Sequence, residues 1–335
     1  MKILVFGAGA IGGFLGGALM AAGLDVTLLV RESVARRLET HGLELSDYTG
    51  MTTEVDSPVS YVTSLKQYDQ TPDVVLLTVK CTGLEQAAEE LLDFVGDQTT
   101  VVCLQNGIGN KEKVARLLPD CRVTSGMVPF NVLNVEGGRL HRGTEGVLQL
   151  EPFPGLEQLL LAWNRVGVPA RECHNYQEVA WGKLLLNLNN ALNGLAGVPL
   201  VEELHQRSYR RVLSASQREL LKALKAKGIK PAKLTKAPPW LIPWILLLPN
   251  WLFKLIAQQM LAIDPQARSS LWEDLERRRK TEIEFLNGAV LALAESCGTP
   301  APVNRAIIGL VKDAEEKGLG SPNFSGEDLA RRLLG

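Results

Sequence analysis

The chain has 335 residues, of which 46% are hydrophobic and 22% charged, and its formal net charge is -1. This balance is typical of a globular protein and excludes the strongly basic character of a nucleic-acid-binding domain. The length is sufficient for two domains of about 150 residues each. Five scattered cysteines without C-x-x-C spacing argue against a disulfide framework or a zinc site. With no signal-peptide pattern before the first strand, we expect a cytoplasmic location.

The N-terminal residues predict a dinucleotide-binding βαβ unit. Apolar runs at 2–6 and 25–30 predict buried strands, and 13–22 predicts a small-residue helix. A G-x-G-x-x-G motif lies between the first strand and the helix, which is the context that makes this motif specific. We expect it to bind a pyrophosphate on backbone amides at the helix N-terminus. Its residues are Gly7, Ala8, Gly9, Ala10, Ile11 and Gly12.

The end of the second strand indicates which dinucleotide binds. Sites that prefer NAD place an acidic residue there to bind the ribose 2′-hydroxyl. Here the strand ends in Val30 and Arg31, and a guanidinium can pair with a 2′-phosphate through two N–H groups. Arg31 therefore favours NADP(H), although Glu32 follows at once and a solvated surface arginine is the alternative interpretation.

Further alternation of strands and helices predicts an α/β fold with a Rossmann-type parallel sheet. The expected strands are 73–79, 99–104 and 122–128 with short strands inside 43–62 and 132–150, and the expected helices are 32–41, 83–94 and 111–118. From residue 176 the pattern becomes all-helical, with helices expected at 176–195, 201–227, 269–297, 304–317 and 326–334. We therefore expect an NADP-binding domain at 1–173 and a helical substrate domain at 174–335.

An apolar stretch at 237–263 lies inside an insertion of about residues 230–265. Four prolines divide it into pieces too short to span a membrane. We interpret it as a buried hairpin-like insertion or a subunit contact, so a homodimer stays open. Attachment to a membrane surface is the less favoured alternative.

Polar residues that could take part in catalysis or binding follow two predicted strands and lie on one predicted helix. Lys80 and Asn106 come at strand ends, where an open α/β sheet binds ligands. Lys80 could contact cofactor phosphate or ribose, and Asn106 the nicotinamide region or a substrate carboxylate; a solvated lysine and a turn asparagine are the alternatives. Lys183 and Asn187 share a face of a mostly apolar helix. Such a lysine could donate a proton to the alkoxide formed by hydride transfer to a ketone, or extend its ammonium to water.

A second polar set lies in the expected helix 269–297. Ser270 and Asp274 are one helical turn apart, and Glu282 follows two turns later. Glu282 could pair with Lys183 or bind a substrate hydroxyl, whereas a surface charge is the ordinary alternative.

Taken together, these residues resemble the ketopantoate reductase family (2-dehydropantoate 2-reductase) over nearly the whole chain. The matching segments are Gly7 to Gly12, Val79-Lys80, Leu104 to Gly107, Trp181-Gly182-Lys183 with Asn187, Ser270, Lys280 to Ile283 and Asn287-Gly288. The resemblance implies NADPH-dependent reduction of 2-dehydropantoate to (R)-pantoate in pantothenate and coenzyme A biosynthesis. It also implies a site in the cleft between the two domains.

The resemblance assigns a role to each matching residue. Lys183 corresponds to the general acid and Glu282 to the acidic residue that orients it and the substrate hydroxyl. The other positions correspond to a residue near nicotinamide and substrate (Asn106), to substrate-binding groups (Asn187 and Ser270), to a supporting residue (Asp274) and to the pair that holds the NADP phosphate (Arg31 and Lys80).

The chain departs from the family pattern at two polar positions and in its insertion. A glutamine three residues after Lys80 is replaced by Gly83, and an asparagine eight residues after Lys183 is replaced by Ala191. These differences leave open the reduction of another branched 2-oxo acid. A non-catalytic NADP-binding sensor is a separate alternative, and the presence of both Lys183 and Glu282 counts against it.

Overall fold

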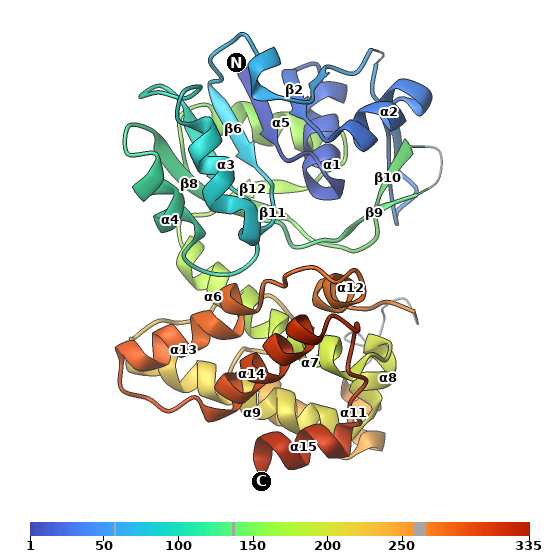
Figure 1. Ribbon diagram of the computed structural model, residues 1–335, viewed down its shortest axis with the longest axis vertical. Helices are drawn as coiled ribbons and strands as arrows, with labels where there is room; N and C mark the ends of the chain where they lie inside the picture. Colours follow the sequence, from blue (N-terminus) through green and yellow to red (C-terminus); the bar gives the residue numbers. More distant parts are fainter. Residues whose placement is uncertain (57, 136–137, 258–265) are drawn as a thin grey trace. The chain divides into compact units, whose positions relative to one another are not determined.

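The computed structural model of the chain describes residues 1–56, 58–135, 138–257 and 266–335. These residues form two compact units, Met1–Tyr176 and Gln177–Gly335, drawn in Figure 1. The first unit combines strands with helices, and the second is helical throughout its described residues. The predicted α/β class, with a parallel sheet followed by an all-helical part, is confirmed.

Among the described residues, the first unit contains an eight-stranded sheet of order β12-β11-β8-β7-β6-β1-β2-β5. The strands from β8 to β5 in this order run parallel, β11 is antiparallel to β8, and β12 is parallel to β11. The central strands are short runs of buried apolar residues because helices cover both faces. The bounds are β1 Lys2–Phe6, β2 Asp25–Leu29, β5 Tyr61–Val62, β6 Val74–Leu77, β7 Thr100–Cys103, β8 Arg122–Met127, β11 Leu148–Leu150 and β12 Ala170–Glu172.

Side chains of β1 alternate between two hydrophobic cores, one on each face of the sheet. Ile3 and Val5 belong to the core that contains residues of α1, α2 and α5. Leu4 and Phe6 belong to the core formed with α3 and α4, which lie side by side on the sheet in Figure 1. Helix α5 and strand β12 fall in residues 151–175, for which there was no prediction. The helices are α1 Ala10–Ala21, α2 Glu32–His41, α3 Leu84–Leu91, α4 Asn110–Leu117 and α5 Leu156–Arg165.

A second sheet of the first unit, of order β4-β3-β10-β9, carries a buried ion pair. Arg142 donates to the carboxylate of Asp47, and both side chains are at most 3% exposed. Burial alone would raise the pKa of Asp47, but hydrogen bonds from Thr49, Arg142 and the Met51 amide outweigh it and lower the pKa to about 2. The strands are β3 Glu44–Asp47, β4 Thr52–Glu54, β9 Val132–Asn134 and β10 Arg139–Arg142.

The helices of the second unit follow the apolar periodicity of the sequence, with breaks that the periodicity does not reveal. The expected helix 176–195 is interrupted at Leu188, and the expected helix 201–227 at Gln206. The expected helices 304–317 and 326–334 are confirmed within two residues. The bounds are α6 Tyr176–Asn187, α7 Asn189–Ala196, α8 Leu200–His205, α9 Arg207–Ala226, α10 Ile242–Leu246, α11 Asn250–Ile256, α12 Ser270–Glu276, α13 Asn287–Ser296, α14 Pro302–Lys317 and α15 Gly326–Leu334.

The expectation of a continuous helix over 269–297 is wrong. Helix α12 is 7 residues long, and Arg278 just beyond it has a left-handed backbone with φ 53°. The amides of Arg278 and Arg279 donate to the carbonyls of Leu275 and Asp274, respectively, which is a Schellman motif. Glycine usually occupies the left-handed position, so an arginine there gives no stop signal in the sequence.

The apolar stretch 237–263 folds into α10 and α11 as far as residue 257, and its last residues lie outside the described part of the chain. Where the structure describes the chain, no helix is long and apolar enough to cross a membrane. Arg210 of α9 fixes the inner side of both helices. Its guanidinium donates to the carbonyls of Leu246 and Leu248, at 2.8 and 2.9 Å, and lies 4.1 Å from the centroid of the buried Phe253 ring.

Candidate functional site

The glycine motif closes the turn between β1 and α1, and its three glycines meet different requirements. Gly7 has φ +85°, and a Cβ there would lie 2.5 Å from Cγ1 of Val79. A Cβ on Gly12 would lie 2.2 Å from Oγ1 of Thr78, so only glycine allows α1 to lie this close to the sheet. A Cβ on Gly9 would meet only the carbonyl oxygen of Gly7, at 3.9 Å, and no side chain caps the first turn of α1. The free amides of that turn can therefore receive an anion that approaches the backbone at Gly9.

Four loops lie together at the carboxyl edge of the first sheet, because β7, β6, β1 and β2 are parallel neighbours. The glycine motif follows β1, Arg31 follows β2, Lys80 follows β6 and Asn106 follows β7. The amide of Ala8 donates to the carbonyl of Leu29 at 3.0 Å, which joins the glycine turn to the end of β2. Arg31 and Lys80 are exposed, and Asn106 is half-buried. This edge is where open α/β sheets bind their ligands.

The end of β2 presents a cation rather than a carboxylate. Arg31 is the N-cap residue of α2 and has an exposed side chain, and Glu32 is the first residue of the helix. Arg36 is also exposed, whereas Arg37 donates to Oδ1 of Asn134 at 2.8 Å and is committed to β9. An exposed guanidinium at this position can pair with a phosphate through two N–H groups, and the exposed Glu32 carboxylate lies next to it in the chain.

Lys183 and Asn187 lie one turn apart on α6, the helix that opens the second unit. Both are half-buried, while neighbouring side chains such as Leu184 are buried. The segment that contains Ala232 packs closely against α6 at Gly182. A Cβ on Gly182 would lie 2.5 Å from the carbonyl oxygen of Ala232. Lys183 is therefore carried by a tightly packed helix.

Helix α12, which carries Ser270 and Asp274, is fixed to α7 by the residue before it. The Ser269 hydroxyl donates to the Asn190 carbonyl at 3.0 Å, and the Ser269 amide donates to Oδ1 of Asn193 at 2.8 Å. Ser270 is exposed at the start of α12, and Asp274 is buried one turn later. Ser270 and Asp274 are thus held against α7, the helix that follows Lys183 and Asn187 in the chain.

Sequence reasoning missed the buried acid behind this junction. Glu203 of α8 is completely buried, and Nδ2 of Asn193 donates to its carboxyl at 2.6 Å. Burial raises the pKa of Glu203 to about 8, so the carboxyl is mostly protonated at neutral pH. A pair of adjacent glutamates in a short helix gave no signal that one of them is internal.

Glu282 does not continue the face of α12, because that helix ends before it. It is a half-buried residue immediately before the 3₁₀ helix Ile283–Phe285. The preceding Thr281 fixes the segment, since its amide and hydroxyl donate to Oε1 of Glu315 at 2.8 and 2.6 Å. Glu282, Lys183, Asn187 and Ser270 all belong to the second unit, whereas the predicted cofactor residues belong to the first.

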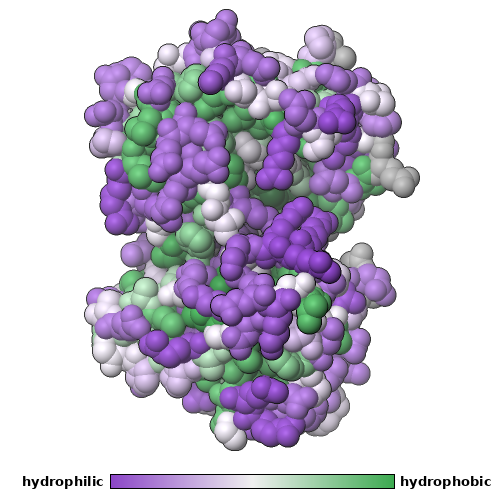
Figure 2. Space-filling view, viewed as in Figure 1, coloured by the Kyte–Doolittle hydropathy of each residue, from purple (hydrophilic) through white to green (hydrophobic). Residues whose placement is uncertain are grey.

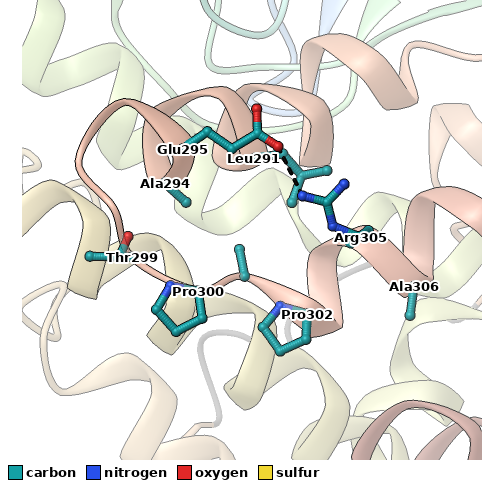
Figure 3. Close-up of a pocket in the computed structure, with 9 residues that line it drawn as sticks. Leu291, Ala294, Glu295, Thr299, Pro300, Pro302, Arg305 and Ala306 are labelled. Atoms are coloured by element: carbon teal, nitrogen blue, oxygen red, sulfur yellow. Dashed lines mark hydrogen bonds and ion pairs between the residues drawn. The ribbon is translucent and has the colours of Figure 1, made fainter.

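A cavity of about 450 Å³ lies elsewhere in the second unit, between α13 and α14 (Figure 3). Glu295 and Arg305 point toward each other at its rim and form an ion pair of 2.8 Å, with both side chains about two-thirds exposed. The rest of its lining is largely apolar, and it includes none of the sequence-predicted site residues. The cavity does not belong to the candidate site.

Comparison with known proteins defines the class. The ketopantoate reductase PanE/ApbA family model matches residues 3–155, and the model of the family's C-terminal part matches residues 175–315. The chain thus belongs to the ketopantoate reductase family, whose members are NAD(P)-dependent oxidoreductases.

Individual relatives extend over nearly the entire chain. A 2-dehydropantoate 2-reductase from Pyrococcus horikoshii is 28% identical over 96% of this chain and 100% of its own. A ketopantoate reductase structure from Ralstonia eutropha JMP134 is 27% identical with a TM-score of 0.80, covering 95% and 99% of the two chains. D-mandelate dehydrogenase, solved with NADH and anilino(oxo)acetate, shares the fold at 20% identity with a TM-score of 0.76, covering 95% and 99%.

Proposed function

We propose that this protein reduces 2-dehydropantoate to (R)-pantoate with NADPH, a step of pantothenate biosynthesis. The observation that carries the proposal is Lys183, a half-buried lysine within the apolar run 179–186 of α6 and one turn from Asn187. Similarity to 2-dehydropantoate 2-reductases over almost the entire chain supports it. The first unit then serves as the NADP-binding domain and the second as the substrate and catalytic domain.

The proposed chemistry divides between the bound dinucleotide and the side chains of this chain. NADPH supplies the hydride that adds to the 2-oxo carbon of the substrate. Lys183 donates a proton to the carbonyl oxygen as negative charge develops on it, which yields the 2-hydroxy acid. Glu282 accepts a hydrogen bond from the substrate hydroxyl and orients Lys183. Asn187 and Ser270 bind the substrate, with Asp274 as support, and Asn106 positions nicotinamide and substrate.

The cofactor is bound in this proposal by the carboxyl edge of the first sheet. The amides of Gly7 to Gly12 bind the pyrophosphate, and Arg31 with Lys80 binds the 2′-phosphate. This assignment is supported by the absence of any side chain near Gly9, by the uncapped start of α1 and by the exposed Arg31.

The direct test measures NADPH oxidation by the purified full chain with 2-dehydropantoate and with a panel of other branched 2-oxo acids. The proposal expects the highest kcat/KM for 2-dehydropantoate. Preference for another 2-oxo acid would retain the mechanism but replace the substrate. The polar side chains missing at Gly83, where a Cβ would meet nothing within 4 Å, and at the buried Ala191 favour this second candidate. NADPH binding without turnover of any substrate would instead make the protein a sensor.

Replacing Arg31 with alanine is expected to raise KM for NADPH about tenfold or more and to leave KM for NADH unchanged. The reason is the loss of charge-assisted hydrogen bonds to a 2′-phosphate that NADH lacks. Steady-state kinetics with both cofactors measure the effect, and Arg37→Ala is the matched control because Arg37 is committed to Asn134. Equal changes for the two cofactors in Arg31→Ala would contradict the assignment.

A further inference from the structure

An unusual surface covers the outer side of α10 and α11 in the second unit. Hydrophilic side chains dominate the face of the molecule seen in Figure 2, yet this segment exposes five large apolar side chains. Each is 52–70% exposed, and we call the set the tryptophan surface: Trp240, Trp244, Trp251, Leu255 and Ile256. Trp251 and Leu255 are one helical turn apart on α11, whereas Trp244 lies on α10 and Trp240 in the turn before it. Exposed apolar side chains gathered in this way mark an interaction site.

The inner side of the segment is firmly packed, so the exposure is not a consequence of loose folding. Leu246 and Phe253 are completely buried, and Arg210 joins both helices to α9. The outward tryptophans are therefore presented by a fixed support.

The surroundings of the tryptophan surface are strongly basic. Residues 207–256 contain eleven lysines and arginines and a single acid, Glu219, although the chain as a whole has a net charge of -1. The carboxylate of Glu219 is bound at the start of α14, where it accepts hydrogen bonds from the amides of Val303 and Asn304 at 2.8 and 3.0 Å. All of these cations except Arg210 are exposed, and within the described residues none of the exposed ones forms an ion pair.

Five of these cations form a stripe along one face of α9, next to the tryptophans. Their spacings of 4, 7, 4 and 3 residues keep them within about 60° around the helix axis. The guanidinium of Arg218, in the middle of the stripe, lies 5.0 Å from the ring centroid of Trp244. The stripe consists of Arg207, Arg211, Arg218, Lys222 and Lys225.

We infer that the tryptophan surface and the α9 stripe bind the surface of a membrane rich in anionic lipid. Tryptophan is favoured at the membrane–water interface because its ring is apolar and its N–H is polar. Exposed lysines and arginines beside it are attracted by anionic headgroups. A second copy of the chain fits less well, because a two-fold contact would bring two basic stripes into one interface with no acidic surface within residues 207–256 to pair with them. This assignment adopts the alternative that the sequence favoured less, attachment to a membrane surface, and it is independent of the catalytic residues.

Vesicle flotation of the full chain tests the inference. We expect the protein to float with vesicles that contain phosphatidylglycerol, to stay behind with pure phosphatidylcholine, and to release as salt is raised. Tryptophan emission should shift to shorter wavelength on binding. No flotation with the anionic vesicles at low salt, or equal flotation with both kinds, would overturn the inference.

Two variants and a control assign the binding to these residues. Trp251→Ser with Leu255→Ser, and separately Lys222→Glu with Lys225→Glu, should each weaken vesicle binding at least tenfold. Leu161→Ser, which removes an apolar side chain 66% exposed in the first unit, should not weaken it. Circular dichroism checks that each variant is folded. Undiminished flotation of the first variant would rule the surface out, and a dimer abolished by the same variant would assign the surface to a second copy.

Discussion

Replacing Lys183 with alanine is expected to lower kcat for reduction of the 2-oxo acid by about 100- to 10,000-fold, the usual range for loss of a general acid. Binding of NADPH should persist, because the residues proposed to bind it belong to the first unit. The reason for the loss is specific: without the ammonium, water must protonate the oxygen as the hydride arrives. Steady-state kinetics and cofactor titration on the same preparation measure the two quantities.

Rescue of kcat by an added amine would distinguish a role of Lys183 as proton donor from a role in packing. Methylammonium can enter the space left by the Lys183 side chain and should restore part of kcat in Lys183→Ala, increasingly with its concentration. Gln177→Ala, an exposed change on the same helix, is the matched control and should leave kcat unchanged. Loss of less than tenfold in Lys183→Ala would remove the lysine from the chemistry. A large loss without rescue would limit it to positioning or packing.

Replacing Asp47 with alanine is expected to destabilise the first unit by about 3–5 kcal/mol, since it leaves the guanidinium of Arg142 buried and unpaired. The pair closes one end of the β3–β10 ladder, where Arg142 is opposite Asp47. Urea unfolding of the purified full chain, followed by circular dichroism, measures the change.

The other end of the same ladder provides the control. Arg139 is opposite Glu44 there, and Nε of Arg139 lies 2.9 Å from the Glu44 carboxylate, with the Arg139 side chain 46% exposed. Because solvent screens this pair, Glu44→Ala should cost about 1 kcal/mol or less. Similar costs for the two substitutions would show that burial does not set the strength of the Asp47–Arg142 pair.

The Asp47 effect should also depend on pH in a definite direction. Its pKa is lowered to about 2 by folding, from an ordinary value of 3.8. The folded state therefore favours the ionised carboxylate, and the stabilisation is complete above about pH 5. It is lost as pH falls from about 4 toward 2, so the stability of wild type and Asp47→Ala should converge in acid.

Local patterns predicted the sheet and its carboxyl edge well, for physical reasons that can be named. Strand β1, the glycine turn and α1 are contiguous in sequence. Each has a composition typical of its structure: apolar residues in β1, glycines in the turn and mostly small residues in α1. The positions of Arg31, Lys80 and Asn106 then follow from parallel strand order alone. The second unit was less predictable because its helix ends depend on backbone conformation. Arg278 in a left-handed conformation is the clearest case.

The sequence patterns did not predict hydrogen bonds between polar side chains that are far apart in the chain. Asn287, quoted above as part of a matching motif, is completely buried, and its Nδ2 donates to Oδ1 of Asn304 at 2.9 Å. The hydroxyl of Ser216 donates to the same oxygen at 2.8 Å, and Nδ2 of Asn304 donates to Glu219 at 2.7 Å. These partners come from three helices, so no spacing in the sequence relates them. The motif residue thus has a structural role that its pattern did not indicate.

Helix α1 has a consequence for protein engineering. Replacing helical glycines with alanine is a common route to greater stability, because glycine costs about 1 kcal/mol relative to alanine inside a helix. Here that route is closed at four positions of one helix. A Cβ would come within 3.0 Å of a side chain of the sheets or their loops at each of them: Gly12, Gly13, Gly16 and Gly17. The chain gives up helix propensity to bring α1 close to the strands, so replacing these glycines with alanine is not a route to a more stable variant.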